Sequence, residues 1–528
     1  MGLVSIMSHL INDPIGALWL IQQAKVEPFA RLPVVSGMAA RRKTEVESET
    51  GFRKELYPES YRPANSYIAH LQFHLRNEIV HLEFLQRLFQ IIDKQIIQDW
   101  INTEPTGQYA RRVAFLYEWL TDKQLSAPDN IGGSYVDVLS DKYLITASQA
   151  QIEKCPRWRV NNNLAGNRDF CPTLVKTPQF EQAMNLNVQT LLNGLIDEFG
   201  EELLMRSSVW LTLRESKASF KIEGEGNQTT RIARFADVIA RYTGKGEIPL
   251  DEMSLSHLQK EILGDKVPFH HYGVRLSPVF VGQTHHFQEI VHYIAPSYPL
   301  VSAKLAGLKA FWQKTQGQSP IMRSAVLAFG FVYIHPLADG NGRVHRFLFN
   351  DVLRRDGVLP ENVILPISGV IAESAHERQR YFALLDEVSK PLMQSIGNDY
   401  SFSKQQKVYA DGIRSNLIFD AESKANPIWS YLDLSHHVIY LARLLEQVVN
   451  RDMREESLYL LHHEQAREAI KEIMEMPNDY ADRIIRSARQ NRGKLTNKLV
   501  KEFDFLENNE DLWQQLLSAI TQAFNNRF

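Results

Sequence analysis

Cysteine is scarce in this chain, since only Cys155 and Cys171 occur among 528 residues. So few thiols exclude a disulfide-stabilised scaffold and favour a reducing compartment, and we therefore expect a cytoplasmic protein. Long apolar runs are missing as well, because the most apolar stretch, residues 324–334, is far too short to span a bilayer. The first ten residues lack the basic start of a secretory signal. We therefore expect no association with a membrane.

A surplus of charge of either sign is also absent. Lys and Arg number 59 against 62 for Asp and Glu, which gives a formal net charge of −3. This balance gives no reason to expect a nucleic acid or an acidic membrane as the partner of the whole chain. Apolar residues at 44% and charged residues at 23% are typical of globular proteins, and the length calls for more than one hydrophobic core.

The apolar pattern is predominantly helical. From Leu71 to Ile91, apolar residues recur at three- and four-residue steps, which predicts an amphipathic helix. The last segment of the chain is rich in helix formers and poor in glycine. We therefore predict a mostly α fold in three parts: a mostly helical N-terminal extension over residues 1–185, a central domain over residues 186–395 and a helical C-terminal domain over residues 396–528.

The most informative stretch is IHPLADGNGRVHRF, residues 334–347. It combines a base, a carboxylate, a glycine-rich turn and two arginines, at His335, Asp339, Gly340, Asn341, Gly342, Arg343 and Arg346. Glycines let a ligand come close to the backbone, and a helix that starts at such a turn offers free N–H groups to an anion. The arginines would point toward the same anion, and a carboxylate beside polyphosphate commonly binds magnesium. The stretch predicts a nucleotide-phosphate site with a base nearby.

These residues resemble the signature of the Fic family, H-x-F-x-[DE]-G-N-G-R-x-x-R, with Leu337 where the family prefers phenylalanine. The resemblance implies a Fic helical core and the transfer of AMP from ATP to a hydroxyl of a target protein. By this resemblance His335 is the general base, Asp339 binds magnesium, and the glycines, Asn341 and the two arginines bind the nucleotide. We expect Leu337 to pack in the core and to leave the chemistry intact.

A second stretch, SFKIEG from Ser219 to Gly224, resembles the Fic inhibitory motif [ST]-x-x-x-E-[GN]. The resemblance implies that Glu223 pairs bidentately with Arg346 and occupies the place of the γ-phosphate. The position of SFKIEG before the signature is similar to that in Fic proteins whose inhibitory helix precedes the core. The alternative is a solvent-facing glutamate at a helix C-terminus, where the helix dipole disfavours it slightly.

Two more features are similar to Fic elements. A target-docking flap, a hairpin that aligns the target by strand addition, is predicted at GVRLSPVFVG, residues 273–282. Its docking residues would be Val274, Arg275, Leu276, Ser277, Val279, Phe280 and Val281. Tyr381 resembles the position that lines the adenine pocket in relatives, and a core aromatic is the alternative.

The C-terminal segment carries a basic patch, defined here as Arg483, Arg486, Arg489, Arg492, Lys494, Lys498 and Lys501. A solvated helical face is the simpler interpretation. The alternative is a helix-turn-helix-like module around the Asn491–Gly493 turn that contacts phosphate backbones.

The leading hypothesis is an autoinhibited protein adenylyltransferase that uses ATP and magnesium. Its partner would be a target protein with an exposed segment that bears a Ser, Thr or Tyr hydroxyl, and assembly into a homo-oligomer stays open. One alternative is a Fic enzyme that mainly removes AMP or transfers another phosphate-containing group. The other is a catalytically silent nucleotide-sensing or DNA-binding regulator, against which the intact His335 and Asp339 argue.

Overall fold

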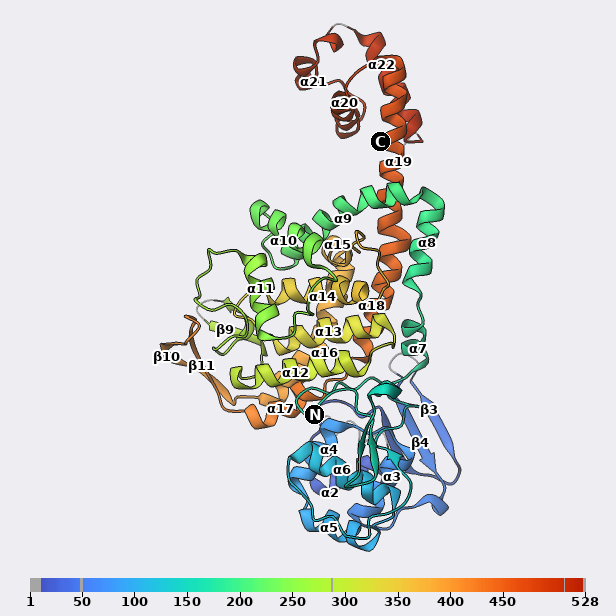
Figure 1. Cartoon of the computed structure of the whole chain (residues 1–528), viewed down its shortest axis with the longest axis vertical. Helices are drawn as coiled ribbons and strands as arrows, with labels where there is room; N and C mark the ends of the chain where they lie inside the picture. The colour runs from blue at the N-terminus through green and yellow to red at the C-terminus, as the bar shows by residue number, and fades with distance from the viewer. Residues whose placement is uncertain (1–10, 48–50, 286–287, 508, 526–528) are drawn as a thin grey trace. The chain divides into compact units, whose positions relative to one another are not determined.

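The computed structural model describes residues 11–47, 51–285, 288–507 and 509–525, and Figure 1 shows the whole chain. The fold is mostly α, as predicted. Within the described parts of the chain, no helix is long and apolar enough to cross a membrane. The chain forms two compact units: Met1–Leu186, Ser216–Glu361 and Ile367–Leu444 make unit 1, and Asn187–Glu215, Asn362–Pro366 and Leu445–Phe528 make unit 2. These units join segments distant in sequence, and the three-part division by residue number stays a prediction.

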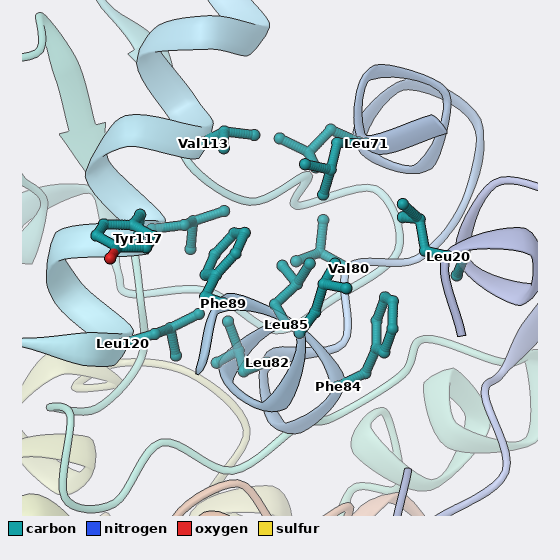
Figure 2. Close-up of a cluster of buried hydrophobic side chains, with 14 of the residues drawn as sticks. Leu20, Leu71, Val80, Leu82, Phe84, Leu85, Phe89, Val113, Tyr117 and Leu120 are labelled. Carbon is teal, nitrogen blue, oxygen red and sulfur yellow. The ribbon is translucent and has the colours of Figure 1, made fainter. Parts of the chain in front are cut away.

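The N-terminal part of unit 1 packs helices around an apolar cluster, which Figure 2 shows with Leu20, Leu71, Leu85 and Phe89 among its members. Its helices are α2 (Ala17–Ala24), α3 (Tyr67–Asn77), α4 (Leu82–Ile91), α5 (Lys94–Thr103) and α6 (Gln108–Thr121), with α7 (Pro178–Met184) following later and short 3₁₀ turns at η1 (Glu59–Tyr61) and η2 (Gln149–Gln151).

The prediction of one amphipathic helix from Leu71 to Ile91 is wrong, because the chain breaks between α3 and α4. Glu78 ends α3, and its carboxylate accepts hydrogen bonds from His74 at 2.8 Å and from the Ala17 N–H at 2.9 Å. The His81 ring then accepts from the Phe84 N–H at 3.2 Å and caps α4. The apolar period runs through both helices, so it does not reveal the break.

Two small sheets in this part were not predicted. One has the order β1 (Pro14–Ile15), β2 (Val34–Met38), β4 (Arg53–Tyr57) and β3 (Lys43–Val46), with β2 and β4 parallel. The other has the order β5 (Val136–Asp137), β7 (Val160–Asn162) and β6 (Glu153–Cys155). These strands are short, and β3 is exposed at every position, so no alternation of apolar and polar residues marks it.

The central part of unit 1 places two helices side by side, α13 (Pro320–Ile334) and α14 (Asn341–Arg355), joined by the signature loop (Figure 1). Around them lie α10 (Thr229–Tyr242), α11 (Glu252–Leu263), α12 (Tyr298–Lys314), α15 (Ile367–Glu373) and α16 (Ala375–Ile396), together with the antiparallel pair β8 (Phe280–His285) and β9 (Gln288–Ile294). Leu337 is fully buried, as expected.

A second antiparallel pair follows α16, formed by β10 (Tyr400–Val408) and β11 (Arg414–Phe419). We predicted a helical C-terminal domain over residues 396–528, and this strand pair within it was not predicted. The polar run KQQK in β10 interrupts the apolar alternation that would mark a strand. The chain continues into α17 (Glu422–Ser430) and α18 (Ser435–Gln447).

Unit 2 contains α8 (Val188–Phe199), the first part of α9 (Glu201–Ile222), the π-helical turn η3 (Val448–Met453) and α19 (Arg454–Ile473), then α20 (Asn478–Gln490), α21 (Asn497–Glu502), η4 (Asp504–Leu506) and α22 (Glu510–Ala523). Buried side chains of α19 to α22, such as Ile470, Ile485, Leu499 and Trp513, form a separate apolar core. Helix α9 ends in unit 1, at Ile222.

Candidate active site

His335 ends helix α13 in a left-handed conformation, with φ of 51°. Few non-glycine residues adopt it, and here it ends the helix and turns the chain into the loop that follows. The imidazole Nδ1 lies 3.1 Å from the carbonyl oxygen of Val332. Because a carbonyl oxygen only accepts, Nδ1 carries the proton and Nε2 keeps its lone pair. The ring is therefore held in the tautomer that a general base needs.

The electrostatic surroundings also favour a neutral His335. Burial lowers the pKa of the imidazole to about 4, and the nearby positive charge of Arg275 acts in the same direction, against the hydrogen bond to Val332. The ring is therefore unprotonated at neutral pH, ready to accept a proton.

The loop after His335 is fixed by Asn341. Its side-chain Nδ2 donates to the carbonyl of Leu337 at 2.8 Å, and its Oδ1 accepts from the N–H of the same residue at 2.9 Å. We predicted Asn341 as part of the anion cradle, but its side chain binds the loop itself, so only its backbone N–H is left for an anion. Gly340, with φ of 90°, begins α14, whose first N–H groups have no partner within the helix.

Arg343 and Arg346 extend from the first turns of α14 toward the end of α9, and both are buried. Arg343 Nε donates to Glu223 Oε2 at 2.9 Å. Arg346 donates to Glu223 Oε1, and its Nε donates to Ser219 Oγ at 2.7 Å. One carboxylate therefore bridges two guanidinium groups. The predicted bidentate pairing of Glu223 with Arg346 alone is wrong, because the second oxygen binds Arg343.

Gly342 leaves the space that the Glu223 carboxylate needs to reach the two arginines. A Cβ at position 342 would lie 2.5 Å from Glu223 Oε1 and 3.0 Å from an Arg346 nitrogen. The alternative prediction, that Glu223 faces solvent at a helix C-terminus, is wrong, because its side chain is only 23% exposed. Gly224 follows it with φ of 80°.

The charge state of Glu223 follows from two opposing effects. Burial opposes ionisation, but the charges of Arg346 and Arg343 outweigh burial and hold the pKa of Glu223 below its usual value. The carboxylate is therefore ionised at neutral pH and binds the arginines as an anion. Glu225 has Lys221 four residues before it, where the inhibitory motif needs Ser or Thr, yet it adds a contact of 3.3 Å to Arg343 that the sequence did not indicate.

The predicted flap is displaced along the chain. The hairpin consists of β8 and β9, so Phe280 and Val281 belong to it, whereas Val274, Leu276, Ser277 and Val279 precede it. The prediction that GVRLSPVFVG forms the hairpin itself is therefore wrong. Pro278 and the bend at Leu276 and Ser277 before it end the apparent alternation.

Arg275 and Asp411 hold the segment before the hairpin. The buried Arg275 guanidinium donates to the carbonyls of His335 at 2.8 Å and Ser277 at 2.7 Å. Asp411, between β10 and β11, accepts from the Leu276 N–H at 2.8 Å and from the Ser277 hydroxyl at 2.7 Å. Arg275 therefore braces the start of the loop that follows α13. The sequence did not predict the role of Asp411, because its partners lie more than a hundred residues earlier and no local pattern indicates the contact.

Tyr381 lies in α16, buried among aromatic rings. Its ring centroid is 6.1 Å from that of His345 and 6.5 Å from that of Phe329. Burial raises the pKa of Tyr381, and the interaction of its hydroxyl with Arg346 opposes this. Tyr381 thus lies in the core near Arg346, and its place at an adenine pocket stays a prediction.

The donor set at Asp339 suits a magnesium ion bound through a nucleotide. Asp339 is exposed, and its Oδ1 accepts from the Gly340 N–H at 2.6 Å. In the described parts of the chain, no group of three or more His, Cys, Asp or Glu residues could hold a metal. One carboxylate completed by phosphates and water is a common way for proteins to hold magnesium.

Comparison with known proteins assigns the family. The Fic/DOC family model matches residues 249–353. Over 182 residues the chain is 28% identical to Protein adenylyltransferase fic-1 of Caenorhabditis briggsae, which covers 33% of this chain and 32% of that protein. Over 186 residues it is 27% identical to Protein adenylyltransferase fic-1 of Caenorhabditis elegans, which covers 34% of this chain and 33% of that protein. The matched stretch thus spans about a third of either relative.

Two solved structures are similar to parts of the chain. A Fic family protein from Desulfovibrio desulfuricans G20 has a TM-score of 0.37 at 18% identity and covers 57% of this chain and 82% of its own. A Fic domain containing signaling protein from Bacteroides thetaiotaomicron VPI-5482 has a TM-score of 0.33 at 18% identity and covers 52% of this chain and 97% of its own. On the family match and the signature, the chain carries a Fic domain of the Fic/DOC family.

Proposed function

We propose that this protein is an autoinhibited adenylyltransferase, which transfers AMP from ATP to a Ser, Thr or Tyr hydroxyl of a target protein. The observation that carries the proposal is the pairing of a neutral, tautomer-fixed His335 with two buried arginines at the start of α14. The similarity to proteins named adenylyltransferases supports the same reaction.

In the proposed reaction the target oxygen attacks the α-phosphorus of ATP. A bond forms between this oxygen and the phosphorus, the bond from the phosphorus to the oxygen bridging toward the β-phosphate breaks, and pyrophosphate leaves. His335 Nε2 accepts the hydroxyl proton, because its Nδ1 is committed to Val332. The α14 N–H groups and the two arginines stabilise charge on the phosphates. Bound magnesium, held by Asp339 and the phosphates, would neutralise charge on the departing pyrophosphate.

The same geometry supports inhibition by Glu223. Its carboxylate already occupies Arg343 Nε and the Arg346 guanidinium, which are the groups that would bind the outer phosphates. Two anions cannot share these donors without strong repulsion, so productive ATP binding requires Glu223 to move away. Glu223 is thus proposed to compete with the γ-phosphate.

The flap proposal moves with the structure. We place target docking on β8 and β9, with the segment from Val274 to Val279 as its base, braced by Arg275 and Asp411. Strand addition to a hairpin uses main-chain hydrogen bonds and tolerates many sequences. The hairpin would therefore not select the target, and contacts outside the hairpin would have to do so.

The test compares labelled nucleotides. Purified wild type, Glu223→Gly and Glu223→Gly/His335→Ala are incubated with magnesium and ATP labelled at either the α- or the γ-phosphate. Label from α-labelled ATP alone, in Glu223→Gly and absent from the double variant, supports AMP transfer with His335 as the base. Label from γ-labelled ATP would indicate phosphate transfer instead. Binding of ATP without label from either nucleotide would favour a silent regulator.

A further inference from the structure

The C-terminal part of unit 2 forms a helix–turn–helix. Helix α20 ends at Gln490, the chain turns through Asn491 and Gly493, and α21 begins at Asn497. The turn is fixed, since the Gly493 N–H donates to the Ala488 carbonyl at 2.7 Å and the Gly493 carbonyl accepts from the Trp513 indole at 3.2 Å. Both helices therefore have a defined placement on their own apolar core.

The exposed side of these helices is cationic. Besides Arg483, its exposed basic residues are Arg486, Arg492, Lys494, Lys498 and Lys501. No ion pair engages these side chains within the described part of the chain, although carboxylates lie on the same helices. Glu502 pairs with Arg483, and Asp482 binds Arg467 at 2.7 Å. The exposed Asp479 lies in the first turn of α20 and acts on Arg483, at the end of the helix away from the turn.

The ion pair between Arg483 and Glu502 brings the outer faces of the two helices together. Arg486 lies one helical turn from Arg483, and Lys498 lies one turn from Glu502, so both cations face the same side as the ion pair. Lys494 is in the turn that joins the helices. Arg486 and Lys498 thus lie on the same side of the two helices as the ion pair, with Lys494 in the turn between them.

The basic patch is smaller than the sequence indicates. Arg489 lies inward, with its guanidinium 4.1 Å from the Phe524 ring centroid and 4.9 Å from that of Tyr459. Arg483 is paired with Glu502. Within the described chain, the basic residues of the patch that remain free to bind an anionic partner are therefore Arg486, Arg492, Lys494, Lys498 and Lys501.

We propose that the exposed surface of α20, the turn and α21 binds duplex DNA. The major groove admits one helix, and Asn497, exposed at the start of α21, has the amide that pairs with adenine edges. The unpaired cations would contact phosphates on either side of the groove. Binding to single strands relies on exposed aromatic rings, and the exposed Tyr480 of α20 already packs on Phe503, with ring centroids 4.8 Å apart.

The test measures fluorescence anisotropy of a labelled 30-base-pair duplex of mixed sequence with the full-length protein at several salt concentrations. Wild type should bind with a steep salt dependence, and Lys498→Ala/Lys501→Ala should bind about tenfold more weakly, with a log–log salt slope smaller by about 2. Lys404→Ala/Lys407→Ala removes two exposed lysines from β10 and is the matched control. Lys498→Arg/Lys501→Arg keeps the charges and should keep the affinity.

Three results would overturn the proposal. The first is that wild type fails to bind the duplex at low salt. The second is that the control loses as much affinity as the Lys498→Ala/Lys501→Ala variant. The third is that a single strand or an RNA of the same length binds more tightly than the duplex. Circular dichroism melting of each variant should match that of wild type, because the substituted lysines are exposed. Weaker binding would then come from the lost charges and not from unfolding.

Discussion

Replacing Glu223 by glycine should free both arginines of the site at once. The carboxylate holds Arg343 Nε at 2.9 Å and also binds the Arg346 guanidinium, so this one change removes both contacts. Because His335, Asp339 and the α14 N-terminus are untouched, the variant keeps the groups proposed to carry out the transfer. The proposed result is a higher rate of AMP transfer at limiting ATP.

The size of the effect follows from these two charge-assisted hydrogen bonds. Each contributes about 1.5 kcal/mol at the lower end of the usual range, so the closed arrangement is favoured by about 3 kcal/mol. At about 1.4 kcal/mol for each factor of ten, about one molecule in a hundred then has its arginines free for ATP. Glu223→Gly should therefore raise transfer about 100-fold at low ATP, and less at saturation, where the nucleotide itself displaces the carboxylate.

The assay is the initial rate of labelling with α-labelled ATP over a range of ATP concentrations. Glu225→Gly is the matched control, because it removes a nearby carboxylate that makes only one longer contact, 3.3 Å, with Arg343. This control should stay close to wild type. Equal rates for wild type and Glu223→Gly, with ATP bound equally well by both, would refute the competition between Glu223 and the γ-phosphate.

Three further predictions test neighbouring contacts. Ser219→Ala removes the 2.7 Å hydrogen bond to Arg346 and should raise the same labelling rate about fivefold, for about 1 kcal/mol; no change would contradict its share in the inhibition. In Glu223→Gly, kcat/KM should stay level from neutral pH downward and fall only near pH 4, as His335 gains a proton; a midpoint near 6.5 would show that burial does not lower its pKa. Asn341→Ala leaves the Leu337 N–H and carbonyl unpaired and should cost about 2–4 kcal/mol of unfolding free energy in urea; an unchanged midpoint contradicts this.

The sequence predicted what depends on local spacing. Seven residues in one short window fix the loop between α13 and α14, and the four-residue step from Ser219 to Glu223 places both beside Arg346. The sequence did not predict contacts across long separations, such as Asp411 at the base of the flap or the second oxygen of Glu223 on Arg343. Which donor a carboxylate reaches depends on how helices pack, and no pattern within one segment carries that information.

The absence of a side chain at Gly342 has a consequence for how the proposed inhibition can be lost. The carboxylate of Glu223 and a nucleotide phosphate would use the same space, which any Cβ at this position would fill. A substitution there would expel the inhibitor and the substrate together and yield an inactive protein. Selection for hyperactive variants should therefore return changes in the SFKIEG segment and spare the glycine, so the route to uncontrolled activity is narrow and lies outside the catalytic loop.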